Sequence, residues 1–271
     1  MAEKEHLKNK EKYKNMEKNT DNFLGNEEIP RKIMVIFFIV DTSGSMDGTK
    51  IGEVNSAIEE TLSALKDISD SNPDAEVKLA ILSFNSEVRW ITPETGPVDP
   101  GLYVWRDLDA AGLTRMGAAF EELESKLHAD KFMKSATSSY APVMFLMSDG
   151  EPTETEEKFL SGLNKLKANK WFKAGIKVAL GIGQDSDLDV LKAFTGTKEA
   201  VLQTDDYTKL KSMIQFVSVT STEVASQSVS GGIKDDGSLK TKQEQVEEKI
   251  QEFAIDNTDG LDHDSDDEWE I

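Results

Sequence analysis

Apolar residues occur along the chain in two patterns, which predict strands and helices in turn. One pattern is the short continuous run, such as Lys32–Val40, whose β-branched and aromatic residues are typical of a strand buried on both faces. The other pattern repeats apolar residues every three or four positions, as Ile51, Val54 and Ile58 do, and this indicates a helix. The predicted strands are Lys32–Val40, Glu76–Phe84, Glu87–Thr92, Pro142–Met147, Lys177–Ile182 and Ala200–Leu202.

Helical periodicity separates most of these strands. Strands that alternate with helices predict a mostly parallel sheet with helices on both faces, which is a three-layer α/β/α fold. The short turn Asn85-Ser86 joins two strands directly, and it predicts a hairpin that adds one antiparallel edge strand. Thr153 and Glu156 have the spacing of a capping box, which predicts a helix start at this point.

Composition divides the chain into three zones. Residues 1–30 are polar and nearly balanced in charge, and we expect them to form a flexible N-terminal arm. Residues 31–222 contain all the predicted strands and form the α/β domain. Residues 223–271 begin as a linker, contain one short amphipathic helix and end in an acidic tail. From Ile233 onward this zone has fourteen Asp and Glu against four Lys.

The role of two apolar segments stays open at the level of sequence. Val246, Ile250 and Phe253 predict the amphipathic helix of the last zone, which docks either on the domain or on a partner. The segment Pro97–Asp109 contains Leu102-Tyr103-Val104-Trp105, which either covers the edge of the core or forms a partner-binding patch.

The formal net charge of −20 limits the classes of partner. Nucleic acids and the anionic leaflet of a membrane both attract basic surfaces, so neither is expected to bind this chain. A strongly acidic protein that binds an acidic group needs a cation between the two. The sequence has no cysteine, which excludes disulfides and thiolate metal sites.

Hydropathy predicts a cytoplasmic protein. The most apolar stretch, Ile33–Val40, has eight residues, whereas about 20 are needed for a helix that spans a bilayer. Met1–Asn26 is a run of mainly Lys, Glu and Asn without the apolar core of a signal peptide.

Hydroxyl and carboxylate side chains follow two of the predicted buried strands. The first strand ends in Asp41-Thr42-Ser43-Gly44-Ser45, and a later strand ends in Ser148-Asp149-Gly150. Ligands of open α/β sheets bind at the carboxyl ends of strands, where the strand order reverses. We therefore expect Asp41, Ser43, Ser45 and Asp149 to lie close together.

A third segment, Gly112–Gly117, places the hydroxyl of Thr114 just ahead of a predicted helix. The candidate metal ligands are thus all hard oxygen donors, and two of them are carboxylates. Such a set suits Mg²⁺, with Mn²⁺ as an alternative, and does not suit zinc or copper. The five candidate ligands are Asp41, Ser43, Ser45, Thr114 and Asp149.

One enzyme class also begins with an apolar strand that ends in Asp. A haloacid-dehalogenase-like phosphohydrolase needs a second Asp two residues further on as its general acid, and Ser43 occupies that position here. A hydroxyl does not perform this proton transfer at neutral pH. The phosphohydrolase is therefore kept only as the alternative to a non-enzymatic binding module.

Three motifs in this order resemble the metal-ion-dependent adhesion site (MIDAS) of von Willebrand factor A (VWA) domains. They are Asp-x-Ser-x-Ser at Asp41, Gly-x-Thr-x-x-Gly at Gly112 and Ser-Asp-Gly at Ser148. The resemblance covers residues 31–222 and implies a Rossmann-like VWA domain with a complete MIDAS. It implies direct ligation by Ser43 and Ser45, with Asp41 acting mainly through water and hydrogen bonds.

The resemblance also implies a role. The metal keeps an open position for an acidic side chain of a partner protein, so the chain is expected to be an adaptor or scaffold. Ile29-Pro30-Arg31 and Ser148–Thr153 look most like bacterial TerY-like VWA proteins, which are associated with tellurium resistance. This narrower resemblance implies a stress-response pathway whose partners include a Ser/Thr kinase, a PPM-type phosphatase or other tellurium-resistance proteins.

Overall fold

The structure is a computed structural model, which describes residues 31–135, 139–227, 234 and 237–258. The predicted arm at 1–30 and the acidic tail from residue 259 lie outside the described residues. None of the described helices is long and apolar enough to span a bilayer.

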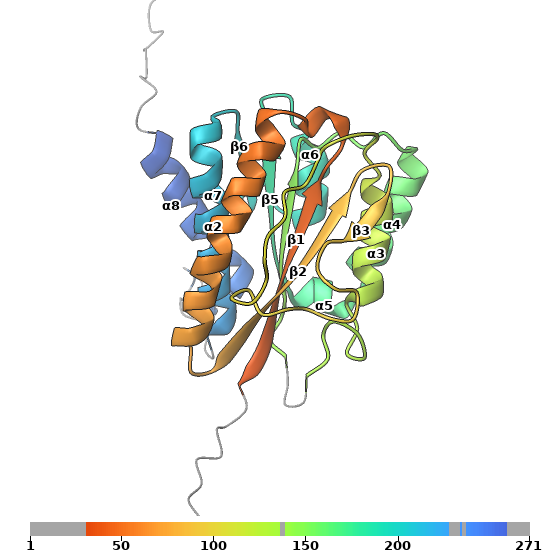
Figure 1. The fold of residues 1–271 in the computed structure, drawn as a ribbon. Helices are drawn as coiled ribbons and strands as arrows, with labels where there is room; N and C mark the ends of the chain where they lie inside the picture. Colours follow the sequence, from red (N-terminus) through yellow and green to blue (C-terminus); the bar gives the residue numbers. More distant parts are fainter. Residues whose placement is uncertain (1–30, 136–138, 228–233, 235–236, 259–271) are drawn as a thin grey trace, which may run out of the picture. The chain divides into compact units, whose positions relative to one another are not determined.

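Six strands form a single sheet in the order β3-β2-β1-β4-β5-β6 (Figure 1). All neighbouring strands are parallel except β2 and β3, which form the antiparallel hairpin at one edge. The predicted fold class, a mostly parallel sheet with one antiparallel edge strand, is therefore confirmed. The strands are β1 (Lys32–Asp41), β2 (Ala75–Phe84), β3 (Val88–Trp90), β4 (Val143–Ser148), β5 (Ile176–Ile182) and β6 (Val201–Thr204).

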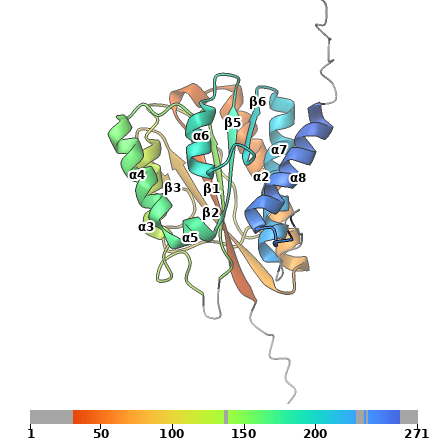
Figure 2. The same cartoon turned by 180° about the vertical axis from the view of Figure 1, so that it is seen from behind.

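Helices cover both faces of the sheet (Figures 1 and 2). On one face lie α2 (Thr49–Ser71), α7 (Tyr207–Ser226) and α8 (Lys242–Thr258). On the other face lie α3 (Met116–Lys126), α4 (Glu156–Ala168), α5 (Lys170–Ala174) and α6 (Leu188–Thr195). A single turn of 3₁₀-helix, η1 (Gly44–Met46), lies between β1 and α2 in the chain.

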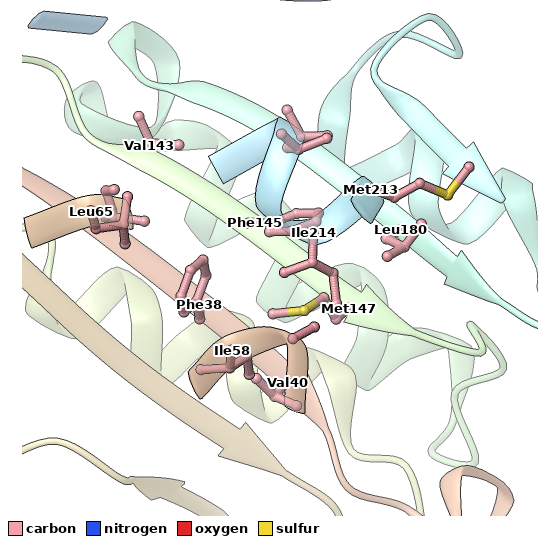
Figure 3. Packing of buried hydrophobic residues seen from close by; sticks show 14 of the residues in the cluster. Phe38, Val40, Ile58, Leu65, Val143, Phe145, Met147, Leu180, Met213 and Ile214 are labelled. Carbon is pink, nitrogen blue, oxygen red and sulfur yellow. The ribbon is translucent and has the colours of Figure 1, made fainter. Parts of the chain in front are cut away.

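Alternation along β1 supplies both halves of the core. Phe38 and Val40 pack with the helices of the α2 side, whereas Phe37 and Ile39 pack on the α3 side. Figure 3 shows Phe38, Val40 and residues of β4 and β5 packed against α2 and α7. All residues from Met34 to Val40 are fully buried, which explains why this strand reads as a continuous apolar run.

Helix α8 docks on the domain, which decides between the two roles that the sequence left open. Val246 and Ile250 are fully buried in the core of the α2 side, and the ring of Phe253 stacks on Phe216 of α7 with centroids 4.1 Å apart. The amide of Gln243 also binds both the backbone N–H and the carbonyl of Lys177 in β5, at 2.8 and 3.0 Å. These contacts make α8 part of the folded body.

The aromatic segment before Thr114 is divided between core and surface. Trp105 is buried, and the hydroxyl of Tyr103 donates a hydrogen bond to the carbonyl of Ile91. Leu102 and Val104 point to solvent, with exposed fractions of 83% and 78%. The two aromatic residues of this segment therefore cover the core, while its two aliphatic residues do not.

Two local predictions need correction. Helix α4 begins at Glu156 with Thr155 as its N-cap residue, so Thr153 does not form the predicted capping box. Its hydroxyl instead accepts a hydrogen bond from the backbone N–H of Thr114. The final helix of the predicted domain extends to Ser226, past residue 222, at which the domain was expected to end.

Candidate metal site

The end of β1 buries a carboxylate that accepts two short hydrogen bonds. Asp41 has no exposed surface, and it lies in register with Phe84 at the end of β2. The backbone N–H of Ser43 donates to Oδ1 of Asp41 at 2.8 Å, and the hydroxyl of Ser148 donates to Oδ2 at 2.6 Å. Ser148 is the last residue of β4, so this contact joins the carboxyl ends of the two central strands.

Burial raises the pKa of Asp41 from 3.8 to about 6, although the hydrogen bonds from Ser148 and Ser43 act in the opposite direction. The nearby charge of Asp149 raises this pKa further. No cationic side chain forms an ion pair with Asp41 within the described part of the chain. A desolvated carboxylate in this situation is stabilised strongly by a bound cation.

The hydroxyls of the first loop converge next to this carboxylate. Oγ of Ser43 and Oγ of Ser45 are 3.1 Å apart, which is close enough for both to contact one ion. Between them, the backbone N–H of Gly44 donates to the carbonyl of Gly112 at 3.0 Å. A Cβ atom at position 44 would lie 3.3 Å from that carbonyl oxygen, so glycine allows the two loops to approach closely.

Thr114 is held against the same loops by backbone contacts. Its N–H donates to the hydroxyl of Thr153, and its carbonyl accepts from the N–H of Thr153 at 3.0 Å. The next N–H, that of Arg115, donates to the carbonyl of Asn85 in the hairpin turn. These contacts fix the buried Thr114 just before the start of α3.

Asp149 follows β4 and forms an ion pair. Oδ2 of Asp149 lies 3.0 Å from Nζ of Lys50, which belongs to the first turn of α2. The backbone turns directly after Asp149, because Gly150 has φ of 91° and its N–H donates to the hydroxyl of Ser148. Ser148 therefore connects Asp41 to the turn that carries Asp149.

Three of the five predicted ligands, Ser45, Thr114 and Asp149, line one open cavity of about 530 Å³ at the carboxyl ends of the strands. Asp41 and Ser43 are buried and are linked to this group by the hydrogen bonds described above. The structure thus brings all five residues to the same edge of the sheet. The cavity is also lined by Lys50, Glu151, Thr153, Ile182, Gly183, Gln184, Asp185, Ser186 and Asp205.

A family model of the von Willebrand factor type A domain matches residues 36–152, the segment that contains all five candidate ligands. Among solved structures, the vWF domain of the type V pili tip protein Mfa5 from Porphyromonas gingivalis aligns with a TM-score of 0.53 at 9% identity. That alignment covers 76% of this chain and 99% of the Mfa5 domain. The fold is that of a von Willebrand factor type A domain.

The sequence relatives of this chain are distant. Inter-alpha-trypsin inhibitor heavy chain H2 is 26% identical over 183 residues in Homo sapiens and 28% identical over 188 residues in Mus musculus. Each alignment covers 65% of this chain and 18% of the relative, so the chain spans only a small part of the length of these relatives.

A mussel protein shows which metal such a motif accepts in another chain. The proximal thread matrix protein 1 from the mussel byssus was solved with a zinc-occupied MIDAS motif, and it aligns with a TM-score of 0.52 at 16% identity over 70% of this chain and 48% of that chain. The zinc belongs to the motif of that protein, and Mg²⁺ stays the prediction for the present site.

The donor set at this edge of the sheet fits a hard divalent cation. It offers two carboxylates and three hydroxyls, and the buried one of these carboxylates has no cation paired with it. No group of three or more His, Cys, Asp or Glu side chains in the described ranges is placed to hold a metal, and the candidate site combines two carboxylates with hydroxyls instead. The carboxyl edge of β1 and β4 is therefore the best candidate for a metal site.

Three residues of this site were not identified from the sequence. Lys50 and Thr153 line the cavity, and Ser148 donates to Asp41. Ser148 could have been found, because it precedes Asp149 and ends a strand predicted to be buried. Lys50 had a weaker signal, a basic residue in the first turn of a helix, where the helix dipole disfavours positive charge.

Proposed function

We propose that this chain is a non-enzymatic binding module that holds one divalent cation and uses it to grip an acidic group of a partner protein. The cation is Mg²⁺ in this proposal, with Mn²⁺ as a substitute, and Asp41, Ser43, Ser45, Thr114 and Asp149 hold it. When bound, the ion supplies a positive charge to which a carboxylate oxygen can coordinate.

One observation carries this proposal. The buried carboxylate of Asp41 and the paired hydroxyls of Ser43 and Ser45 lie together at the edge of an open cavity, which Ser45 lines. Neutral hydroxyl ligands leave positive charge on a bound cation. An open cavity above it leaves room for a group from another molecule, which is the arrangement expected of a docking site and not of a purely structural metal.

The phosphohydrolase alternative receives no support. Both carboxylate oxygens of Asp41 accept hydrogen bonds and the side chain has no exposed surface, so it is poorly placed to attack a phosphoryl group. The position that should carry the general acid is Ser43, whose hydroxyl lies beside that of Ser45.

We also propose a cytoplasmic adaptor role in a tellurium-resistance or stress-response system, with a Ser/Thr kinase, a PPM-type phosphatase or another tellurium-resistance protein as partner. This narrower proposal is supported only by the resemblance of Ile29-Pro30-Arg31 and Ser148–Thr153 to TerY-like proteins. The binding mode proposed above does not depend on it.

Calorimetry with Mg²⁺ and Mn²⁺ tests the metal site directly. We expect measurable binding to the full chain and a loss of at least tenfold in affinity for Asp41→Ala and Ser43→Ala, because Mg²⁺ tolerates little departure from octahedral geometry. Ser63→Ala, on the exposed side of α2, is the matched control and should bind as the unmodified chain does. Unchanged affinity in both site variants would overturn the assignment.

The binding role has a separate test. A partner captured from native cells should be released by EDTA and should not be captured by Asp41→Ala. The same protein with Mg²⁺ should show no turnover of p-nitrophenyl phosphate. Sustained, Asp41-dependent hydrolysis would instead favour the phosphohydrolase.

A further inference from the structure

Lys50 occupies a position that helix electrostatics do not explain. It lies in the first turn of α2, which contains no acidic residue, and a positive charge there opposes the helix dipole. Its Nζ is instead directed to Oδ2 of Asp149, at 3.0 Å. The side chain of Lys50 is 22% exposed and that of Asp149 is 10% exposed, so the pair is largely shielded from water.

The end of β5 lies next to this lysine. Gly183 has φ of 105°, and a Cβ atom added there would contact Cε and Nζ of Lys50 at 3.4 and 3.5 Å. The ammonium therefore lies between the ends of β4 and β5, at the wall of the cavity that Ser45 and Thr114 also line.

The charged side chains that line this cavity are mostly acidic, which makes the positive charge of Lys50 important for binding. Among the described residues that line it, Lys50 is the only cationic side chain, whereas Glu151, Asp185 and Asp205 are acidic in addition to Asp149. A carboxylate that approaches the cavity is repelled by these acids. Lys50 is the only lining side chain in the described part of the chain that offsets this repulsion.

The same charge has opposite effects on a metal and on its ligand. Asp41 and Asp149 provide two negative charges for a divalent cation, and Lys50 cancels part of this attraction through its contact with Asp149. Because Lys50 itself adds one positive charge, the site is more positive after the cation has bound than it would be without this lysine. An acidic group of a partner is then attracted more strongly.

We propose that Lys50 is a specificity-determining residue of the metal site, which lowers affinity for the divalent cation and raises affinity for the acidic group that the loaded site receives. This inference rests on the proposed function, because it assumes that Asp149 belongs to a metal site. It predicts that removal of one charge shifts two affinities in opposite directions, which a lysine with a purely structural role would not do.

The first measurement uses Mn²⁺ alone, titrated by calorimetry into the full-length protein. Lys50→Gln keeps a hydrogen-bond donor near Asp149 but removes the charge, and it should bind Mn²⁺ about tenfold more tightly, since two charges a few ångström apart near a protein surface interact on this scale. Lys50→Arg keeps the charge and should stay close to the unmodified chain. Lys66→Gln, at the other end of α2, removes an equal charge far from the site and should change nothing.

The second measurement uses acetate as the acidic probe, added at fixed ionic strength to protein saturated with Mn²⁺. Displacement of metal-bound water by acetate lowers the proton relaxation rate of the solvent, so the titration reports occupancy of the open position. Lys50→Gln should bind acetate several-fold more weakly, while Lys66→Gln and Lys50→Arg should match the unmodified chain.

The outcomes distinguish a failure of the role of Lys50 from a failure of the metal site. The proposal is supported if Lys50→Gln binds Mn²⁺ more tightly and acetate more weakly, and the two control variants do not. Unchanged affinities, or changes in the same direction, overturn the role of Lys50 while leaving the metal site intact. If the unmodified chain binds no Mn²⁺, or Asp41→Ala binds it equally well, the proposed function fails and the inference fails with it.

Discussion

The interior of β1 and its last residue are buried to the same extent, but burial acts on them in opposite ways. Residues Met34–Val40 and Asp41 all have no exposed surface. For the apolar residues, removal from water is the main source of stability. For Asp41 it is a cost, which is visible in a pKa raised to about 6 by burial.

The comparison shows how one strand serves both stability and binding. The apolar interior holds the strand in the sheet without any ligand, so the strand can present an unfavourable carboxylate at its end. A bound cation would offset the free-energy cost of burying the charge of Asp41, and this gain would contribute to the affinity for the cation. Stability and binding should therefore be separable by mutation, and the tests below are arranged from the largest expected effect to the smallest.

The largest effect is expected from the apolar part of β1. Phe38→Ala should lower the free energy of unfolding by about 3–5 kcal/mol, because it leaves a cavity between β1 and the helices of the α2 side. Urea unfolding measures this change, with Leu102→Ala, at an 83% exposed position, as the control. The folded fraction should still bind Mg²⁺, and a selective loss of Mg²⁺ affinity would contradict the separation.

Replacement of the buried carboxylate should raise the stability of the fold instead of lowering it. In EDTA at pH 7.5, Asp41→Asn should be more stable than the unmodified chain by up to about 3 kcal/mol, since the shift of this pKa from 3.8 to about 6 corresponds to that penalty. The same substitution should abolish Mg²⁺ binding.

The pH dependence gives the sign of this effect. Because the pKa of Asp41 is higher in the folded state, ionisation destabilises the fold increasingly as pH rises from 3.8 to about 6. The stability difference between Asp41→Asn and the unmodified chain should therefore be small near pH 4 and reach its full size above about pH 6. A difference that does not change with pH would show that burial of this charge is not its cause.

Removal of the metal should have a somewhat smaller effect. The linkage relation gives about 2.7 kcal/mol of stabilisation when free Mg²⁺ is 100 times its dissociation constant. EDTA should thus lower the melting temperature by a few degrees, without loss of the far-ultraviolet circular dichroism at room temperature. Unfolding on chelation would mean that the apolar strands do not hold the domain by themselves.

The smallest effect is expected far from both parts of β1. Gln243→Ala removes the two hydrogen bonds that join α8 to the backbone of Lys177, and it should cost about 1–2 kcal/mol. Mg²⁺ affinity should not change, and Glu252→Ala on the exposed side of α8 serves as the control. A change in metal affinity would show that α8 is coupled to the site.

Local patterns were sufficient for most of the fold. The run that forms β1 and the hairpin of β2 and β3 were predicted, because strand periodicity and turn chemistry are properties of neighbouring residues. The start of α4 was misplaced for the same reason. Thr153 has the spacing of a cap, but a partner 39 positions earlier, Thr114, holds its hydroxyl.

By itself, the sequence determined the layered fold and indicated five candidate oxygen donors, four of them after two strands and Thr114 before a helix. Parallel strands bring their carboxyl ends to one edge, so the proximity of Asp41 and Asp149 follows from topology. Only the tertiary structure decided that α8 packs on the domain and that Ser148 binds Asp41. It also decided that Lys50 pairs with Asp149, 99 positions away. No periodicity encodes such contacts, because they depend on how separate elements pack in space.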